Sequence, residues 1–225
     1  MKILAIETTG HFASVALSDR QIKNDTDYSH LQEISPMCLE ILASEGLEGR
    51  ELDVIAVSRG PGSFTGIRIG LATAKALALV WDKPIICVPT LESFAYRDDA
   101  GENTVAIPVF DARRNQVYAG IYKGRKELLK AGAYETEDFK ERLAACLDGE
   151  AFGSCVKYFG DGCYLIGKES SGDQEAKQLL ELADAMYKEG KLDSCFSAEP
   201  EYMRVSEAER KLKEKLAREK CGEKA

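Results

Sequence analysis

The segment that most constrains the fold is a strand, a turn and a helix encoded in succession between residues 54 and 80. Residues 54–57 (Val-Ile-Ala-Val) are apolar and mostly β-branched, which is typical of a buried strand. Residues 60–62 (Gly-Pro-Gly) must form a turn, because proline fixes φ and glycine tolerates conformations that other residues avoid. Ser63 or Thr65 can cap the helix that then runs to about residue 80. The segment predicts an α/β fold.

Small residues recur every four positions in this predicted helix, at Gly66, Gly70, Ala74 and Ala78. Glycine inside a helix costs about 1 kcal/mol relative to alanine, so two glycines on one stripe need a reason. We expect another backbone to approach this stripe closely. From the residues alone, that neighbour is either another part of the chain or a partner subunit.

The turn does not match the known phosphate-binding loops. Position 65 is threonine and no Gly-Lys-Ser/Thr follows, which excludes a P-loop, and the glycines at 60, 62 and 66 miss the dinucleotide-binding spacing by one residue. A helix N-terminus can hold an anion, but no lysine is positioned beside this one. Arg68 and Lys75 interrupt the apolar run well short of the ~20 residues that cross a membrane.

Residues 58–70 read Ser-Arg-Gly-Pro-Gly-Ser-Phe-Thr-Gly-Ile-Arg-Ile-Gly and resemble the signature of the TsaB (YeaZ) family. Residues 3–9, 89–93 and 198–204 fit the same family in the same order, so the resemblance covers nearly the whole chain. Members of this family are non-catalytic subunits of the bacterial tRNA threonylcarbamoyladenosine (t6A) machinery. The resemblance implies an actin-like ATPase (ASKHA, ribonuclease H-like) fold with two duplicated halves, the second truncated.

An internal repeat agrees with such a duplication. Residues 105–110 form an apolar run ending in Asp111, as residues 3–6 end in Glu7, and the same shift places residues 117–121 over residues 13–17. A polar stretch at 97–103 separates the two copies. We therefore expect a first half over residues 1–102 and a second over residues 103–204, with a helix over residues 205–220 that returns to the first half.

A strand that ends in Glu7 and is followed by Thr8, Thr9 and a glycine resembles the first phosphate loop of the actin-like ATPases. In that superfamily the carboxylate positions a metal-bound water, and the amides of the turn hold phosphate. Glu7, Thr8, Thr9 and Asp111 are accordingly candidate vestigial nucleotide-facing residues. The alternative is that Glu7 only accepts hydrogen bonds from its own turn, since a carboxylate without partners does not establish catalysis.

The pattern predicts neither a metal site nor a catalytic residue. His30 stands where catalytic relatives of the family begin a metal-binding His-x-x-x-His pair, but position 34 is Ile34. No cofactor is predicted, although weak nucleotide binding, or nucleotide binding shared within a complex, stays open.

The composition indicates in which compartment the protein works and which class of partner it does not bind directly. Seven cysteines without a C-x-x-C pair argue against a disulfide framework and for a reducing compartment. The N-terminus enters a strand directly, with no basic and apolar leader, so a cytoplasmic protein is expected. A net charge of -8 argues against a main nucleic-acid-binding surface.

The resemblance implies a scaffold that binds a TsaD-like catalytic subunit and a TsaE-like ATPase, contacts tRNA only indirectly, associates with no membrane and forms a homodimer when alone. Because the family pairs through the region of the predicted helix, we assign the partner interface to Gly66, Gly70, Ala74, Ala78, Arg68 and Phe64. On this assignment Gly70→Leu leaves the monomer folded and abolishes association.

The alternative function is an autonomous enzyme. An ATP-dependent phosphotransferase would need Glu7, Asp111 and Asp161 to converge on a nucleotide. A glycoprotease-like enzyme would need a Ser-His-Asp or metal site, and two histidines without a supporting motif offer little for either.

Further patterns predict individual elements. Residues 29–32 read as a capping box for a helix that either kinks at Pro36 or properly begins near it. Helices are also expected around residues 136–147 and 179–187, and a strand over residues 156–159 followed by a turn at 160–162.

Overall fold

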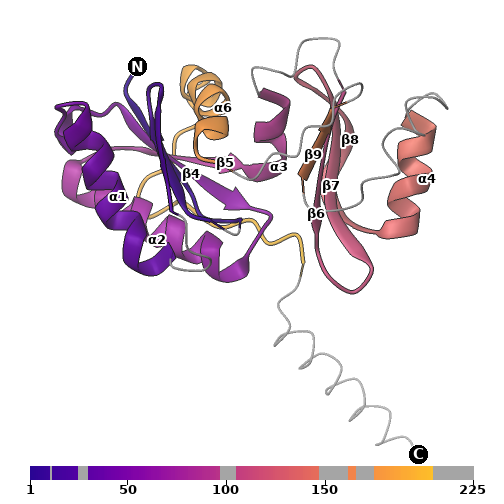
Figure 1. Ribbon diagram of the computed structural model, residues 1–225. Coiled ribbons are helices and arrows are strands. Elements are labelled where there is room, and N and C mark those ends of the chain that lie inside the picture. Colours follow the sequence, from indigo (N-terminus) through magenta and orange to yellow (C-terminus); the bar gives the residue numbers. More distant parts are fainter. Residues whose placement is uncertain (11, 25–29, 97–104, 147–161, 166–174, 205–225) are drawn as a thin grey trace, which may run out of the picture.

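Two β-sheets, each covered by helices, form the body of the protein (Figure 1). The computed structural model describes residues 1–10, 12–24, 30–96, 105–146, 162–165 and 175–204. The first sheet has the strand order β3-β2-β1-β4-β5, with bounds β1 (Ile3–Glu7), β2 (Ser14–Leu17), β3 (Arg20–Lys23), β4 (Val54–Gly60) and β5 (Ile85–Pro89). Strand β1 is antiparallel to β2 and parallel to β4, and β4 is parallel to β5.

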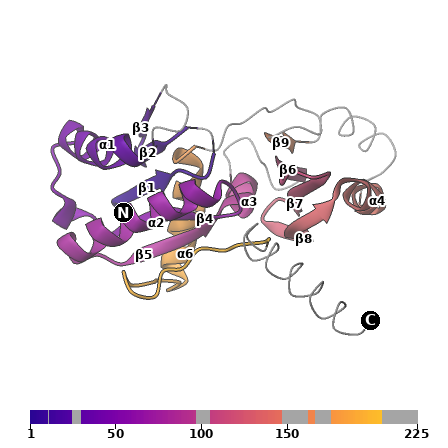
Figure 2. The same cartoon turned by 90° about the horizontal axis from the view of Figure 1, so that it is seen from below.

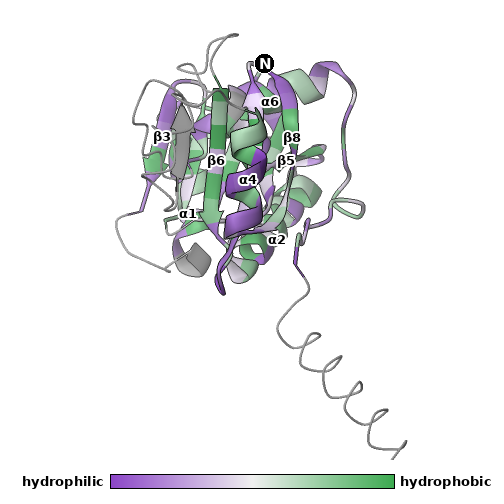
Figure 3. Cartoon of the chain, turned by 90° about the vertical axis from the view of Figure 1, so that its right-hand side faces the viewer, coloured by the Kyte–Doolittle hydropathy of each residue, from purple (hydrophilic) through white to green (hydrophobic). Residues whose placement is uncertain are grey.

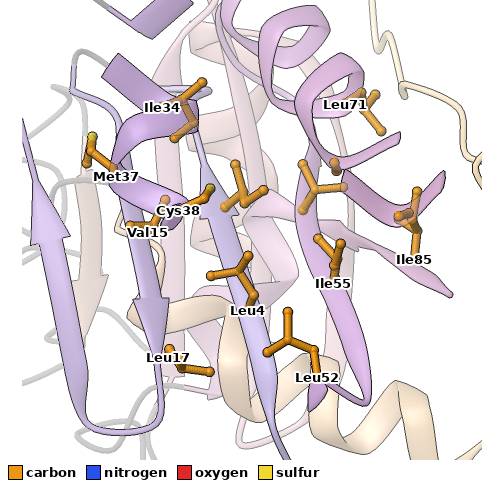
Figure 4. Packing of buried hydrophobic residues seen from close by; sticks show 14 of the residues in the cluster. Leu4, Val15, Leu17, Ile34, Met37, Cys38, Leu52, Ile55, Leu71 and Ile85 are labelled. Carbon is orange, nitrogen blue, oxygen red and sulfur yellow. The ribbon is translucent and has the colours of Figure 1, made fainter. Parts of the chain in front are cut away.

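Alternation along the strands of the first sheet builds a core on each face. Leu4 and Ile6 point to the side covered by α1 (His30–Ser44) and α2 (Phe64–Trp81), whereas Ile3 and Ala5 point to the side covered by α6 (Lys177–Lys188). Such alternation follows from the two-residue period of a strand. Figure 4 shows the first of these cores, in which side chains from the strands meet those of both helices, among them Leu4, Val15, Ile34, Cys38, Ile55 and Leu71.

The strand, turn and helix expected over residues 54–80 form as β4 and α2, with the Ser63 Oγ accepting from the Gly66 amide at the helix start. Helix α1 continues through Pro36, so a helix that begins near Pro36 is wrong. The predicted capping box at 29–32 involves side chains outside the described residues. After β5 come the short helix α3 (Thr90–Ser93) and the 3₁₀ turn η2 (Phe94–Tyr96).

The second sheet has the order β8-β7-β6-β9, with bounds β6 (Val105–Asp111), β7 (Gln116–Lys123), β8 (Lys126–Glu135) and β9 (Gly162–Leu165). Strands β6 and β7 pair antiparallel as β1 and β2 do, which is the pairing the repeat predicts. Helix α4 (Thr136–Cys146) covers one face through Phe139 and Leu143 and turns a polar surface outward (Figure 3). Strand β9 was not predicted, and the strand expected at 156–159 lies outside the described residues.

Helix α6 belongs to the first sheet, which corrects the predicted extent of the second half. Leu179, Leu182 and Ala183 pack on Ile3 and Ala5. At the start of the helix, the Ala176 amide donates to Ser14 Oγ at 2.8 Å and the Lys177 amide to Gln21 Oε1 at 2.9 Å. The range 103–204 was therefore wrong at its C-terminal end, because an amphipathic helix carries no mark of which sheet it will cover. The helix expected over residues 205–220 lies outside the described residues.

Residues 199–204, here called the crossing segment, run from the first half to the second (Figure 2). The Glu201 amide donates to the Arg59 carbonyl at 2.8 Å, and the two side chains form an ion pair at 2.9 Å. Met203 packs against the core of Leu91, Phe94, Phe110 and Tyr122, and Arg204 Nη1 donates to the Ala112 carbonyl. The segment thus ties α2 and β4 to the second sheet.

Candidate functional site

The first candidate carboxylate folds back onto its own turn. Glu7 is buried at the end of β1, and its Oε1 accepts from the Thr9 amide at 2.5 Å and from the Thr9 hydroxyl at 2.6 Å. Ser58 on the neighbouring strand β4 is also buried, and its hydroxyl faces the Glu7 carboxyl. Burial raises the pKa of the Glu7 carboxyl, and the opposing interactions with Thr9, Ser58 and the Thr8 backbone offset that rise only in part. The Thr9 amide is thereby engaged by Glu7.

This burial leads to a prediction for Glu7→Gln. Because the folded state raises the pKa above its ordinary value of 4.5, the folded protein holds this proton more tightly than the unfolded chain does. Its contribution to stability is therefore present below about pH 4.5 and is lost as the pH rises through the folded-state pKa. Glutamine keeps an acceptor for both Thr9 donors without the charge, so we expect a higher melting temperature at neutral pH and a flatter dependence from pH 5 to pH 8.

Thermal denaturation across that pH range measures the effect. The matched control is Glu141→Gln, which removes an exposed carboxylate from α4. A Glu7→Gln protein that melts lower than wild type at neutral pH would show that the ionised form is the stabilising one.

The turn that follows Glu7 is fastened to the beginning of α2. Thr8 Oγ1 donates to the Gly66 carbonyl at 2.8 Å, and the Ser63 amide donates to the Thr9 carbonyl at 2.8 Å. A β-carbon added to Gly66 would lie 1.9 Å from the Thr8 carbonyl oxygen, and one added to Gly70 would lie 2.3 Å from Thr8 Oγ1. The close neighbour of the glycine stripe is therefore this turn of the same chain.

The assignment of Gly66, Gly70, Ala74 and Ala78 to a partner interface is accordingly wrong, since all four residues are buried inside the monomer. The expectation that Gly70→Leu leaves the monomer folded falls with it. Small residues on a helix signal close approach, but they do not say what approaches.

The second candidate carboxylate has a different environment. Asp111 is exposed at the end of β6, and its Oδ1 accepts from the Arg113 amide at 2.6 Å. Arg113, Arg114 and Asn115 then adopt φ values of 61°, 58° and 59°, a left-handed run that only asparagine favours among these residues. The structure thus brings Glu7, Thr8 and Thr9 together, whereas Asp111 stands in the turn of the other half. Asp161 lies outside the described residues.

The outer face of α2 is exposed and largely apolar. It is defined here by Thr65, Arg68, Ala72, Ala76, Leu79 and Val80, all exposed, and by the half-buried Ile69. Leu79 and Val80 are 63% and 68% exposed. By length and composition α2 would be long and apolar enough to cross a membrane, but its inner face packs on the first sheet. Leu39 on the neighbouring α1 is exposed as well, at 57%.

An aromatic and cationic cluster closes one end of this outer face. The Arg68 guanidinium lies 4.0 Å from the Phe64 ring centroid, and its Nε donates to Tyr202 Oη at 2.9 Å. The rings of Phe64 and Tyr202 are 4.8 Å apart. Phe64 and Arg68, both assigned to the interface from the sequence, therefore do lie at the surface. Tyr202 was missed as a site residue, and its only signal was its place in the family segment 198–204.

The described residues contain no group of three or more His, Cys, Asp and Glu side chains arranged to hold a metal ion. His11 and the side chain of His30 lie outside this description.

Comparisons with known proteins give a family model, close relatives in sequence and similar solved structures. The family model described as tRNA N6-adenosine threonylcarbamoyltransferase matches residues 22–151. The tRNA threonylcarbamoyladenosine biosynthesis protein TsaB of Escherichia coli (strain K12) is 34% identical over 94% of this chain and 98% of its own. Its namesake in Haemophilus influenzae is 30% identical over 94% and 97%. A crystal structure of an uncharacterized Pseudomonas aeruginosa protein with similarity to peptidase YEAZ superposes with a TM-score of 0.72 at 27% identity, covering 90% of this chain and 99% of that one.

The mixed five-stranded sheet, its helices and the repeated strand-carboxylate-strand unit place the chain among proteins of the actin-like ATPase (ASKHA) fold. Within that class, the chain belongs to the TsaB (YeaZ) family of tRNA threonylcarbamoyladenosine biosynthesis proteins.

Proposed function

We propose that this chain is a non-catalytic scaffold subunit of a tRNA N6-threonylcarbamoyladenosine transferase. In this role it supports a TsaD-like catalytic subunit, with a TsaE-like ATPase as the third component, and it meets tRNA only through them. The observation that carries the proposal is the exposed outer face of α2, which leaves a long apolar helix half uncovered in the monomer.

The chemistry of this outer face suits another helix. Ala72 and Ala76 lie one turn apart at its centre, so a second helix can approach more closely than the usual ~8–10 Å between axes. Leu79 and Val80 add apolar area at one end, and Arg68 presents the only exposed charge at the other. The family model for the transferase matches more than half of this chain, so a TsaD-like subunit offers an equivalent helix for a pseudo-symmetric pair. The same face would form the homodimer when the partner is absent.

The non-catalytic role is supported by the first turn. In this chain Glu7 accepts two hydrogen bonds from Thr9 instead of facing outward, and Thr8 is occupied by the carbonyl of Gly66. An autonomous phosphotransferase would need these groups to be free for a nucleotide and its metal. Titration of ATP with magnesium against the isolated chain tests that alternative, which tight binding with turnover would favour.

Ala76→Arg tests the partner face. The substitution places a long charged side chain at the centre of the outer face of α2, so we expect it to abolish association with the TsaD-like subunit in size-exclusion chromatography. The circular dichroism spectrum should stay that of the wild type, which shows that the variant is folded. The control is Leu128→Arg, which adds the same charge at an exposed position on β8 in the other half. Normal association by Ala76→Arg would refute this interface.

A reconstitution experiment tests the scaffold role itself. Purified alone with tRNA, ATP, threonine, bicarbonate and the adenylate-forming enzyme, the chain should produce no modified adenosine by mass spectrometry. Addition of the TsaD-like and TsaE-like subunits should restore the modification. Modified adenosine formed without any partner subunit would show that the chain is itself an enzyme and would contradict the scaffold role.

A further inference from the structure

The guanidinium of Arg68 is held in one orientation at the end of the outer face of α2. It lies 4.0 Å from the centroid of the Phe64 ring and 5.9 Å from that of Tyr202. Its Nε donates to Tyr202 Oη at 2.9 Å. Tyr202 is itself fixed through its neighbour Glu201, which is joined to Arg59 by a backbone hydrogen bond and an ion pair. The guanidinium therefore loses little further freedom when it binds an acceptor.

This oriented guanidinium still has donors to offer. Within the described part of the chain, no carboxylate pairs with Arg68, and its hydrogen bond runs from Nε to Tyr202. The N–H groups of a guanidinium match the two oxygens of a carboxylate or a phosphate, and such bidentate pairs are strong. A protein carboxylate is favoured here, because the surface beside the guanidinium is an apolar helix face and the chain has a net charge of -8, neither of which suits a nucleic acid.

The surroundings of Arg68 make a carboxylate necessary once a partner binds. Phe64 and Tyr202 are each 41% exposed. A partner laid on the outer face of α2 would cover both rings and exclude water from the guanidinium between them. A charge that is buried without a partner is costly. A protein that covers this end of α2 must therefore supply an acidic side chain.

A second copy of the chain cannot supply that side chain from the same helix. Helix α2 contains no aspartate or glutamate, and its charged residues are Arg68 and Lys75. In a symmetric pair of α2 helices, each Arg68 would be covered without a carboxylate from the facing helix. This end of α2 thus disfavours pairing with itself and favours a facing helix that carries an acidic residue.

On the basis of the partner role proposed above, we infer that Arg68 makes the outer face of α2 selective for the TsaD-like subunit over a second copy of this chain. It does so by forming a bidentate ion pair with a carboxylate on the facing helix of that subunit. Tyr202 is a positioning residue, which fixes Nε so that the remaining N–H groups point to the partner.

Arg68→Lys is the main test, because lysine keeps the charge but loses the planar group that stacks on Phe64. Isothermal titration calorimetry of the full chain with the TsaD-like subunit should show binding at least about tenfold weaker than for the wild type, as loss of charge-assisted hydrogen bonds predicts. Tyr202→Phe removes only the hydroxyl that fixes Nε and should weaken binding by a smaller factor. The matched control is Arg113→Lys, the same exchange at an exposed position of the second half, which should bind as the wild type does.

The selectivity is measured on the isolated chain by analytical ultracentrifugation. The dissociation constant of the homodimer should not rise in Arg68→Met, because a symmetric pair gives this side chain no acceptor from the facing α2. Glu40→Gln removes an exposed carboxylate of α1 and should also leave the homodimer unchanged, which shows that a second copy does not supply the acceptor from that helix.

The partner carboxylate is located by replacing each acidic residue of the facing helix of the TsaD-like subunit with its amide. One of these changes should weaken binding to the wild-type chain but not to Arg68→Lys. Three results would each overturn the inference: wild-type affinity of Arg68→Lys, a homodimer weakened by Arg68→Met or Glu40→Gln, or normal subunit association with loss of tRNA binding by the Arg68→Lys complex, which would assign the guanidinium to a phosphate. Failure of the partner face itself is distinct, because Ala76→Arg would then also associate normally.

Discussion

Gly66→Ala is expected to lower the stability of the monomer by ~3 kcal/mol or more, at the upper end of overpacking effects, although it adds a single methyl group. The new β-carbon would lie 1.9 Å from the carbonyl oxygen of Thr8. That oxygen belongs to the backbone of a turn that is fixed on both sides, by the Glu7 bonds to Thr9 and by the Ser63 amide. Neither element can yield without breaking these bonds, so the substitution should separate α2 from the sheet. Urea denaturation followed by circular dichroism measures the loss.

The control for this variant is Ala144→Leu, at an exposed position of α4 away from the partner face. It adds more atoms than Gly66→Ala, yet it should change the stability of the isolated monomer by less than ~0.5 kcal/mol, as exposed substitutions usually do. A Gly66→Ala midpoint equal to that of the wild type would mean that the turn and the helix separate at little cost, contrary to the packing described above.

Phe94→Ala is expected to cost ~3–5 kcal/mol, the usual range for truncation of a buried phenylalanine. Phe94 is fully buried, and its ring centroid is 5.5 Å from that of Phe110 on the second sheet. Leu91, Tyr122 and Met203 complete the same core. These residues come from α3 and η2, from the second sheet and from the crossing segment. A cavity among them would therefore loosen the junction between the two halves. Thermal denaturation should show an earlier transition, and limited proteolysis should show faster cleavage.

Phe196→Ala is the matched control, because this ring is 84% exposed and its removal leaves no cavity. We expect a change below ~0.5 kcal/mol. If Phe94→Ala and Phe196→Ala had the same melting temperature, the stability of the two halves would not depend on this core.

Much of the fold could be predicted from local patterns. The buried strands, the Gly-Pro-Gly turn, a helix cap at Ser63 or Thr65 and the shift that relates β1–β2 to β6–β7 all follow from short-range rules. The structure confirms them, with Ser63 as the cap. Each of these features depends on residues within one turn or one strand pair, where sequence spacing and geometry are directly linked.

The site was harder to predict because α2 carries small residues on two faces. Gly66 and Gly70 face the Thr8 turn, whereas Ala72 and Ala76 face outward, and periodicity alone does not say which stripe meets the sheet. Phe64 and Arg68 were placed at the surface, but their contact with Tyr202 joins residues more than 130 positions apart. The placement of α6 in the second half failed for the same reason, since its packing on Ile3 and Ala5 of the first sheet is a long-range contact.

The return of the chain to the first sheet has a consequence for its synthesis. When residues 1–102 have emerged from the ribosome, all five strands of that sheet are available. Ile3, Ala5 and Ile86 still lack the helix that covers them. That helix ends at Lys188, after the whole of β6 to β9. The first half therefore cannot complete its core before the second half has been made. The nascent chain carries an uncovered apolar face while the second half is translated, at on the order of 5–20 residues per second.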